Sequence, residues 1–133
     1  MNEREIEFLR NNHSAIFVTA RTSGMPHVAR VNCTLVGAKM YSSGTQTRVR
    51  LKHVRANPRA AMCVLREEDH SLWLGLEGRI TIIEWPEAFD KLLAIRRATG
   101  REPDDMEAFR QTMIREQRLI FELDVTRTYG RFE

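Results

Sequence analysis

The strongest structural signal in this sequence is an alternation of apolar and polar residues with a period of two. It is clearest in segment 72–82, where one strand face would carry Leu72, Leu74, Leu76, Gly78, Ile80 and Ile82. The opposite face would carry Trp73, Gly75, Glu77, Arg79 and Thr81. Side chains alternate between the two faces of a β-strand, whereas an amphipathic helix repeats every 3.6 residues. The segment therefore predicts a strand with one buried face.

Five other segments carry strand-type patterns, and most of them are separated by hairpin-length turns. They are Ser14–Arg21, His27–Val36, Lys39–Ser43, Arg59–Arg66 and Arg118–Thr126. Helical spacing and helix-ending residues predict four helices, at 3–11, 48–55, 86–98 and 103–116. Six strands with mostly short connections and one helical excursion before the last strand indicate a mainly β (α+β) fold, a small six-stranded antiparallel barrel with flanking helices.

Length and composition agree with one globular domain over residues 1–133. A chain of 133 residues with 42% hydrophobic content can build one core. No apolar run approaches the roughly 20 residues of a membrane span, and the charged N-terminus MNEREIEFLR lacks a signal-peptide pattern. We therefore expect a cytoplasmic protein without a membrane partner. Cys33 and Cys63 show neither metal nor disulfide spacing, and we expect both to be small buried residues.

The segment Ser42–Lys52 (SSGTQTRVRLK) has the composition of an anion-binding site. It combines hydroxyl groups and a flexible Gly44 with the cations Arg48, Arg50 and Lys52. Hydroxyls and backbone N–H groups bond phosphate oxygens, and a guanidinium adds a two-pronged donor. A helix starting near Arg48 would also place Arg48, Lys52 and Arg55 on one face. An exposed helix with solvated charges is the alternative, and composition alone does not separate the two.

Polar side chains elsewhere in the sequence are compatible with a ligand site and equally with ordinary exposure to solvent. Arg30, Asn32 and Thr34 share the non-core face of one strand and could bond the edge of a planar heterocycle. Trp73 stands opposite the core leucines, which suits a subunit interface as well as a ligand contact. The four histidines show no metal spacing, so we expect no metal site, and no catalytic side chain can be named.

Three motifs follow one another along the chain. They are T-x-x-x-S-G-M-P-H-V-A-R-V at 19–31, R-x-R-x-K-x-x-x-x-N-P-R-A at 48–60 and L-x-L-E-G-R at 74–79. Their order and spacing resemble the pyridoxamine 5′-phosphate oxidase-like split β-barrel superfamily over nearly the full length. The later segments D-D-M-E-A-F-R-Q-T-M and R-L-I-F-E-L resemble the branch that uses the deazaflavin coenzyme F-420.

The resemblance implies a homodimer with two cofactor sites along the subunit interface. Carried over residue by residue, Arg48, Arg50 and Lys52 would hold the cofactor phosphate. The superfamily often has Lys at position 50 and Arg at position 52, so the charge is kept while the hydrogen-bonding geometry differs.

The same resemblance assigns roles to five more residues. Ser43, Gly44 and Thr45 would run beside the ring system and the ribityl chain of the cofactor. Asn32 would lie near the ring edge, and Trp73 would reach the ring or the substrate from the partner subunit.

The resulting hypothesis is an enzyme, a coenzyme F-420-dependent oxidoreductase that transfers a hydride between the cofactor and a small organic substrate. The first alternative is an FMN-binding oxidoreductase of the pyridoxamine 5′-phosphate oxidase type. The alternative of another class is a non-catalytic cofactor carrier or a basic barrel that binds nucleic acid. Such barrels use aromatic platforms for base stacking, and aromatic residues are only 8% here and fall mostly on core-type faces. We therefore expect no nucleic-acid partner.

Overall fold

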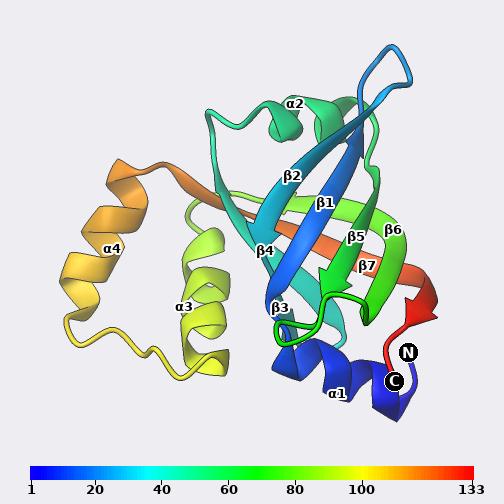
Figure 1. Ribbon diagram of the computed structural model, residues 1–133. Coiled ribbons are helices and arrows are strands. Elements are labelled where there is room, and N and C mark those ends of the chain that lie inside the picture. The colour runs from blue at the N-terminus through cyan, green and yellow to red at the C-terminus, as the bar shows by residue number, and fades with distance from the viewer.

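The computed structural model describes all of residues 1–133 as one curled antiparallel sheet with four helices around it (Figure 1). The strands are β1 (Ser14–Ala20), β2 (Pro26–Asn32), β3 (Thr34–Val36), β4 (Lys39–Thr45), β5 (Arg59–Leu65), β6 (Trp73–Ile83) and β7 (Arg118–Arg131). The helices are α1 (Glu3–Asn11), α2 (Val49–Ala56), α3 (Ala88–Ala98) and α4 (Met106–Arg115). No helix is long and apolar enough to cross a lipid bilayer.

The predicted mainly β fold with flanking helices is confirmed, but the number of strands is wrong. The sheet has seven strands, because the segment predicted as the single strand His27–Val36 divides into β2 and β3. The strand order is β2-β1-β5-β6-β7-β4-β3, so these two consecutive strands lie at opposite edges of the sheet. One residue, Cys33, separates them. The sheet must curl until its edges meet, which makes a barrel with a seam between β2 and the β3–β4 edge.

Cys33 is held at this joint by hydrogen bonds to the residue that precedes β1. Its N–H donates to the carbonyl oxygen of His13 at 2.9 Å, and its own carbonyl oxygen lies 3.1 Å from Nδ1 of His13. The Cys33 side chain is buried, as predicted, whereas Cys63 is only partly buried, so the prediction is wrong for that residue. Burial raises the pKa of the Cys33 thiol to about 12, so Cys33 stays protonated and serves packing rather than nucleophilic chemistry.

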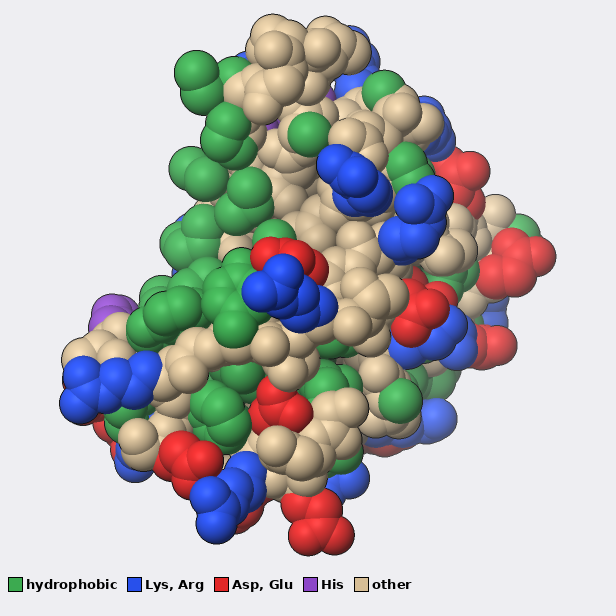
Figure 2. Space-filling view, turned by 90° about the vertical axis from the view of Figure 1, so that its right-hand side faces the viewer, with side chains coloured by type: hydrophobic (Ala, Val, Ile, Leu, Met, Phe, Trp, Pro, Cys, Tyr) green, Lys and Arg blue, Asp and Glu red, His purple; other side chains and the backbone are tan.

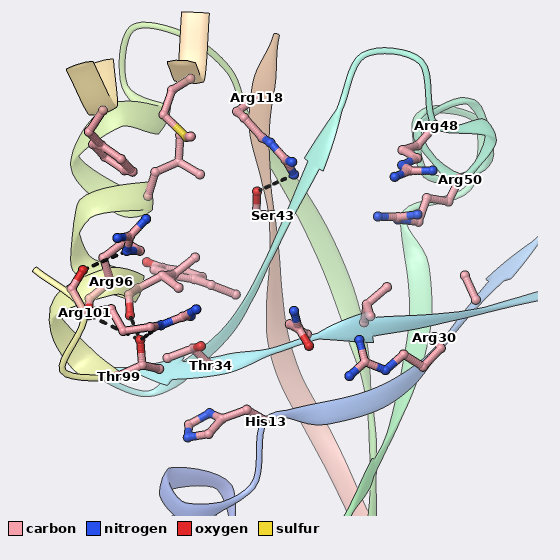
Figure 3. Close-up of a pocket in the computed structure, with 18 residues that line it drawn as sticks. His13, Arg30, Thr34, Ser43, Arg48, Arg50, Arg96, Thr99, Arg101 and Arg118 are labelled. Atoms are coloured by element: carbon pink, nitrogen blue, oxygen red, sulfur yellow. Dashed lines mark hydrogen bonds between the residues drawn. The ribbon is translucent and has the colours of Figure 1, made fainter. Parts of the chain in front are cut away.

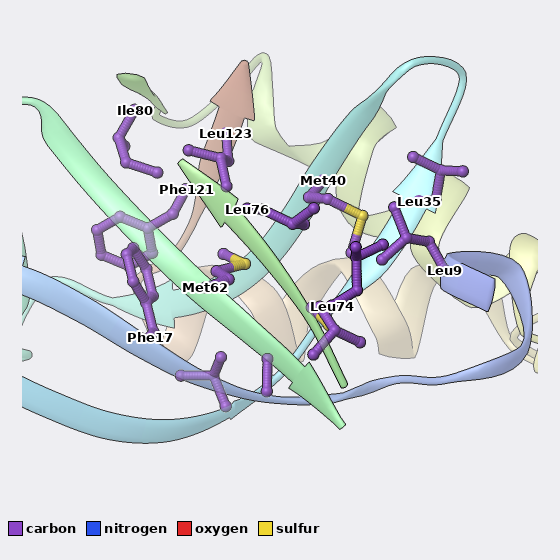
Figure 4. Packing of buried hydrophobic residues seen from close by; sticks show 14 of the residues in the cluster. Leu9, Phe17, Leu35, Met40, Met62, Leu74, Leu76, Ile80, Phe121 and Leu123 are labelled. Atoms are coloured by element: carbon purple, nitrogen blue, oxygen red, sulfur yellow. The ribbon is translucent and has the colours of Figure 1, made fainter. Parts of the chain in front are cut away.

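The barrel interior is filled by the apolar faces of the strands (Figure 4). Phe17 of β1 and Phe121 of β7 meet edge to face with ring centroids 5.6 Å apart, and Leu74 and Leu76 of β6 are fully buried. Helix α1 closes one end, where Leu9 is also fully buried. The alternation in β6 thus predicted the core face correctly, and Trp73 stands outside this cluster as expected.

A second, smaller core lies between the outer face of β4 and β7 and the helices α3 and α4. Its buried members are Tyr41, Ala88, Phe89, Leu92, Leu93, Phe109 and Ile120. In Figure 1 the two helices stand beside the barrel rather than over an end. They turn the outer face of β4 into the floor of a groove.

Several element boundaries differ from the sequence expectation, and three of them show the physical reason. Helix α3 begins at Ala88 rather than at Pro86, and α4 begins after Asp105, whose carboxylate accepts the N–H of Ala108 at 3.1 Å. Strand β7 continues to Arg131, because it pairs along the whole of β6 past an irregularity at Glu77/Gly78. The period of apolar residues along the chain predicts neither the N-cap of a helix nor the length over which two strands pair.

Strand β4 also runs through Gly44 to Thr45, beyond the predicted end at Ser43. A Cβ added to Gly44 would lie 2.5 Å from Cε2 of Phe121 and 3.4 Å from Nη2 of Arg50. Glycine is therefore required by close approach inside the strand rather than by flexibility.

We predict that Gly44→Ala lowers the free energy of unfolding by about 1–3 kcal/mol, the usual cost of overpacking a core. Chemical denaturation measures this change. Gly37→Asn is the matched control, because nothing lies within 4 Å of a Cβ there and asparagine tolerates the φ of +62°. Equal stability of Gly44→Ala and the wild type would contradict the packing assigned to Phe121.

Candidate functional site

A large cavity opens at the seam of the barrel. It has a volume of about 740 Å³ and is lined by residues of β2, β4, α3 and α4, by the start of β7 and by the residues around the start of α2 (Figure 3). Cavities of this size hold organic cofactors and drug-sized ligands. The gap between the two sheet edges and the groove beside α3 and α4 are thus one continuous site.

The charge of the lining is entirely positive. Six arginines face the cavity and no aspartate or glutamate does; the arginines are Arg30, Arg48, Arg50, Arg96, Arg101 and Arg118. Only Arg118 has a carboxylate partner, since its Nε lies 2.9 Å from an oxygen of Glu116. By contrast, the face of the molecule in Figure 2 mixes acidic and basic side chains. Such a concentration of one sign attracts anions.

Arg50 is the arginine of the cavity whose charge is least compensated within the protein. Its guanidinium lies over the Phe121 ring at 5.3 Å from the centroid, and its buried Nε has no hydrogen-bond partner. Burial, followed by the positive charges of Arg48 and Arg118, lowers the pKa of this guanidinium. An arginine nevertheless stays protonated at neutral pH. The protein therefore holds a partly desolvated charge beside like charges, an arrangement that a bound anion would stabilise.

Ser43 and Arg118 complete the polar end of the cavity. Nη1 of Arg118 donates to Oγ of Ser43 at 3.3 Å, which links the ends of two paired strands. Together with Arg48 and Arg50, they offer guanidinium and hydroxyl groups from three separate elements, the combination that binds phosphate oxygens.

Four of the residues predicted to bind a cofactor line this one cavity: Asn32, Ser43, Arg48 and Arg50. The other four do not line it. Gly44 is buried behind the floor against Phe121. The hydroxyl of Thr45 lies 2.9 Å from that of Thr47, and Lys52 is exposed on α2. Trp73 packs edge to face against Tyr129 at the start of β6, with ring centroids 6.1 Å apart.

The predicted convergence of Arg48, Lys52 and Arg55 on one helix face is wrong. Arg48 is the N-cap of α2 and has an extended backbone, so it precedes the helical spacing. Arg55 instead pairs with Glu84 at 3.0 Å. The cations that do converge are Arg48, Arg50 and Arg118.

Sequence reasoning missed Arg96, Arg101 and Arg118 as site residues. Arg118 comes to the site because β7 pairs with β4, where it is the register partner of Thr45. Arg96 and Arg101 come with the α3 side of the groove. These positions follow from the pairing of strands and the docking of helices. Neither is a local sequence pattern, so the sequence did not predict them. The structure contains no cluster of three or more metal-ligating side chains.

Comparison with known proteins identifies the family. The sequence profile of pyridoxamine 5′-phosphate oxidase matches residues 1–132. The chain belongs to this family. No curated protein sequence gives a significant match.

Solved structures agree with the family at the level of the fold. An F-420 reductase superposes with a TM-score of 0.69 at 20% identity, covering 92% of this chain and 94% of the other. The conserved hypothetical protein Rv2991 from Mycobacterium tuberculosis gives 0.79 at 18% identity, with 99% and 85% covered. General Stress Protein 26 from Bacillus anthracis gives 0.71 at 15% identity, with 97% and 92% covered. The superpositions establish a shared split-barrel fold. At these low sequence identities they establish no shared activity.

The position of Arg50 predicts opposite effects of one substitution on stability and on anion binding. Arg50→Met keeps an apolar contact with Phe121 and removes the repulsion, so the ligand-free protein should gain about 0.5–1 kcal/mol after allowance for partial exposure. Inorganic phosphate should stabilise the wild type by binding its folded state, and it should no longer raise the Tm of this variant. Thermal unfolding with and without phosphate measures both effects.

Arg55→Gln is the control on the same helix, because Arg55 is exposed and outside the cavity. It should keep the full phosphate effect. If phosphate stabilises Arg50→Met as much as the wild type, the anion site does not include Arg50.

Proposed function

We propose that this member of the family is a coenzyme F-420-dependent oxidoreductase that transfers a hydride between the deazaflavin and a small organic substrate. The observation that carries the proposal is the cavity at the barrel seam, which is lined by six arginines and no carboxylate. Family membership supplies the class of ligand, a phosphate-bearing flavin-type cofactor.

The residues at the polar end of the cavity fit the phosphate of such a cofactor. Arg50 has a buried, unpartnered Nε, and Arg48 and Arg118 flank it with further donors. Ser43 adds a hydroxyl on the adjacent strand. In our proposal these four residues bind the phosphate, and Asn32 of β2 bonds the edge of the ring system.

The number of arginines favours coenzyme F-420 over FMN. Four of them, Arg30, Arg48, Arg50 and Arg118, lie on β2, around the start of α2 and on β7, and only Glu116 offsets their charge. The single phosphate of FMN would leave part of this charge unbalanced. The tail of coenzyme F-420 carries a phosphate and several carboxylates, which complements the excess.

When bound, the coenzyme supplies the hydride chemistry, and the protein supplies binding and orientation. Arg48 and Arg50 would hold the phosphate at the barrel seam, and residues of β2 and α3 line other parts of the same cavity. No nucleophile is required, in agreement with the protonated, buried Cys33.

We further propose that the chain forms a homodimer. Trp73 does not line the cavity of its own chain. It lies on the outer side of the sheet beside Tyr129, a residue that is 41% exposed. A role of Trp73 at the cofactor therefore requires a second copy of the chain.

The purified protein should bind coenzyme F-420 with a Kd of about 1 µM or lower, and FMN at least about tenfold more weakly. Fluorescence titration measures both constants. Replacing Arg48 or Arg50 by Gln should each weaken F-420 binding about ten- to a hundredfold, because a charge-assisted hydrogen bond is lost.

Arg55→Gln should leave both constants unchanged. Tight binding of FMN without binding of F-420 would assign the protein to the FMN-dependent alternative. Binding of neither cofactor, together with a salt-sensitive shift of single-stranded oligonucleotides, would favour the nucleic-acid alternative.

A further inference from the structure

The cavity has two chemically different ends. The end near α2 offers Ser43, Arg48 and Arg50, which are hydroxyl and guanidinium groups. At the α3 end, Arg96 and Arg101 stand beside apolar side chains (Figure 3). The apolar side chains from α3 and α4 are Leu92, Ile95, Phe109 and Met113. A phosphate group matches the first end, whereas an organic anion with an apolar body matches the second.

Arg96 and Arg101 are oriented by the protein without being neutralised by it. The guanidinium of Arg96 lies over the Phe109 ring, 5.3 Å from the centroid, and its Nε donates to the carbonyl oxygen of Arg101 at 2.7 Å. The Nε of Arg101 donates to Oγ1 of Thr99 at 3.2 Å. The terminal Nη groups of both side chains make no hydrogen bond within the protein, and no carboxylate pairs with either.

The neighbouring Arg97 shows that the chain does neutralise an arginine in this region when it lies outside the cavity. Its Nε is bonded to both carboxylate oxygens of Glu102, at 3.0 and 2.8 Å, and it does not line the cavity. A carboxylate is thus available within a few residues, and none lines the cavity.

We propose that the α3 end of the cavity is a substrate site in which Arg96 and Arg101 bind the carboxylate of an organic acid, and the apolar side chains of α3 and α4 hold its body. Two adjacent guanidinium groups suit a carboxylate, which accepts paired N–H bonds. The carboxylate tail of the coenzyme is a second source of this chemistry, but it lacks an apolar body. This inference rests on the proposed function for the cofactor that shares the cavity.

Benzoate and its neutral counterpart benzamide are the probes. Each is titrated by calorimetry into the protein saturated with whichever cofactor it binds, and into the cofactor-free protein. Benzoate should bind saturably to the wild type. Arg101→Gln, which changes an exposed side chain and should fold normally, should weaken binding about tenfold, and the double variant Arg96→Gln/Arg101→Gln should weaken it further.

Benzamide should bind the wild type about tenfold more weakly than benzoate, and Arg97→Gln should bind benzoate like the wild type. Unchanged benzoate affinity in Arg101→Gln and in the double variant would overturn the substrate site. So would equal losses in Arg97→Gln, or the absence of saturable benzoate binding to the wild type.

A second arm separates the substrate from the coenzyme tail. The Kd of coenzyme F-420 is compared with that of a deazaflavin 5′-phosphate without the carboxylate tail, in the wild type and in the double variant. Neither constant should change in the double variant. A loss confined to coenzyme F-420 would assign the two arginines to the tail and overturn the substrate proposal. Failure of the wild type to bind any cofactor would instead refute the proposed function, and the titration of the cofactor-free protein would still test the carboxylate site.

Discussion

The joint at Cys33 is the constraint on which the rest of the structure depends. Strands β2 and β3 are separated by this single residue, yet they form the two outer edges of the sheet. A flat sheet cannot satisfy both conditions, so the sheet curls and its edges face each other. The hydrogen bonds between Cys33 and His13 fix the point of closure. Beyond that point the edges diverge, and the cavity occupies the opening between β2 and β4.

The second feature that determines what the cavity can bind is its charge. The arginines around the seam repel one another, and Arg50 is partly desolvated as well. A protein selected for stability alone would place a carboxylate among them or replace them with apolar residues. The chain instead pairs arginines elsewhere, as at Arg55 and Arg97, and leaves the cavity free of acids. Unbalanced charge in a cavity is best explained by a ligand that supplies the opposite sign.

Local patterns predicted much of the fold and part of the site. The alternation in β6 identified its buried leucines, and the composition of Ser42–Lys52 identified Ser43, Arg48 and Arg50 as residues that come together. The division of His27–Val36 was not predictable, because apolar alternation continues through Cys33 while the pairing partner changes from β1 to β4. The contributions of Arg118 and Arg96 also depend on strand register and helix docking, which join residues far apart in the chain.

We propose above all that the arginine-lined cavity at the barrel seam holds the phosphate of a deazaflavin cofactor. A crystal structure of the complex with coenzyme F-420 tests it most directly. We expect phosphate oxygens within hydrogen-bonding distance of Nε of Arg50 and Oγ of Ser43, with Arg48 and Arg118 beside them. A phosphate bound outside this cavity, for example at the exposed Lys52, with Arg50 still unpartnered, would contradict it.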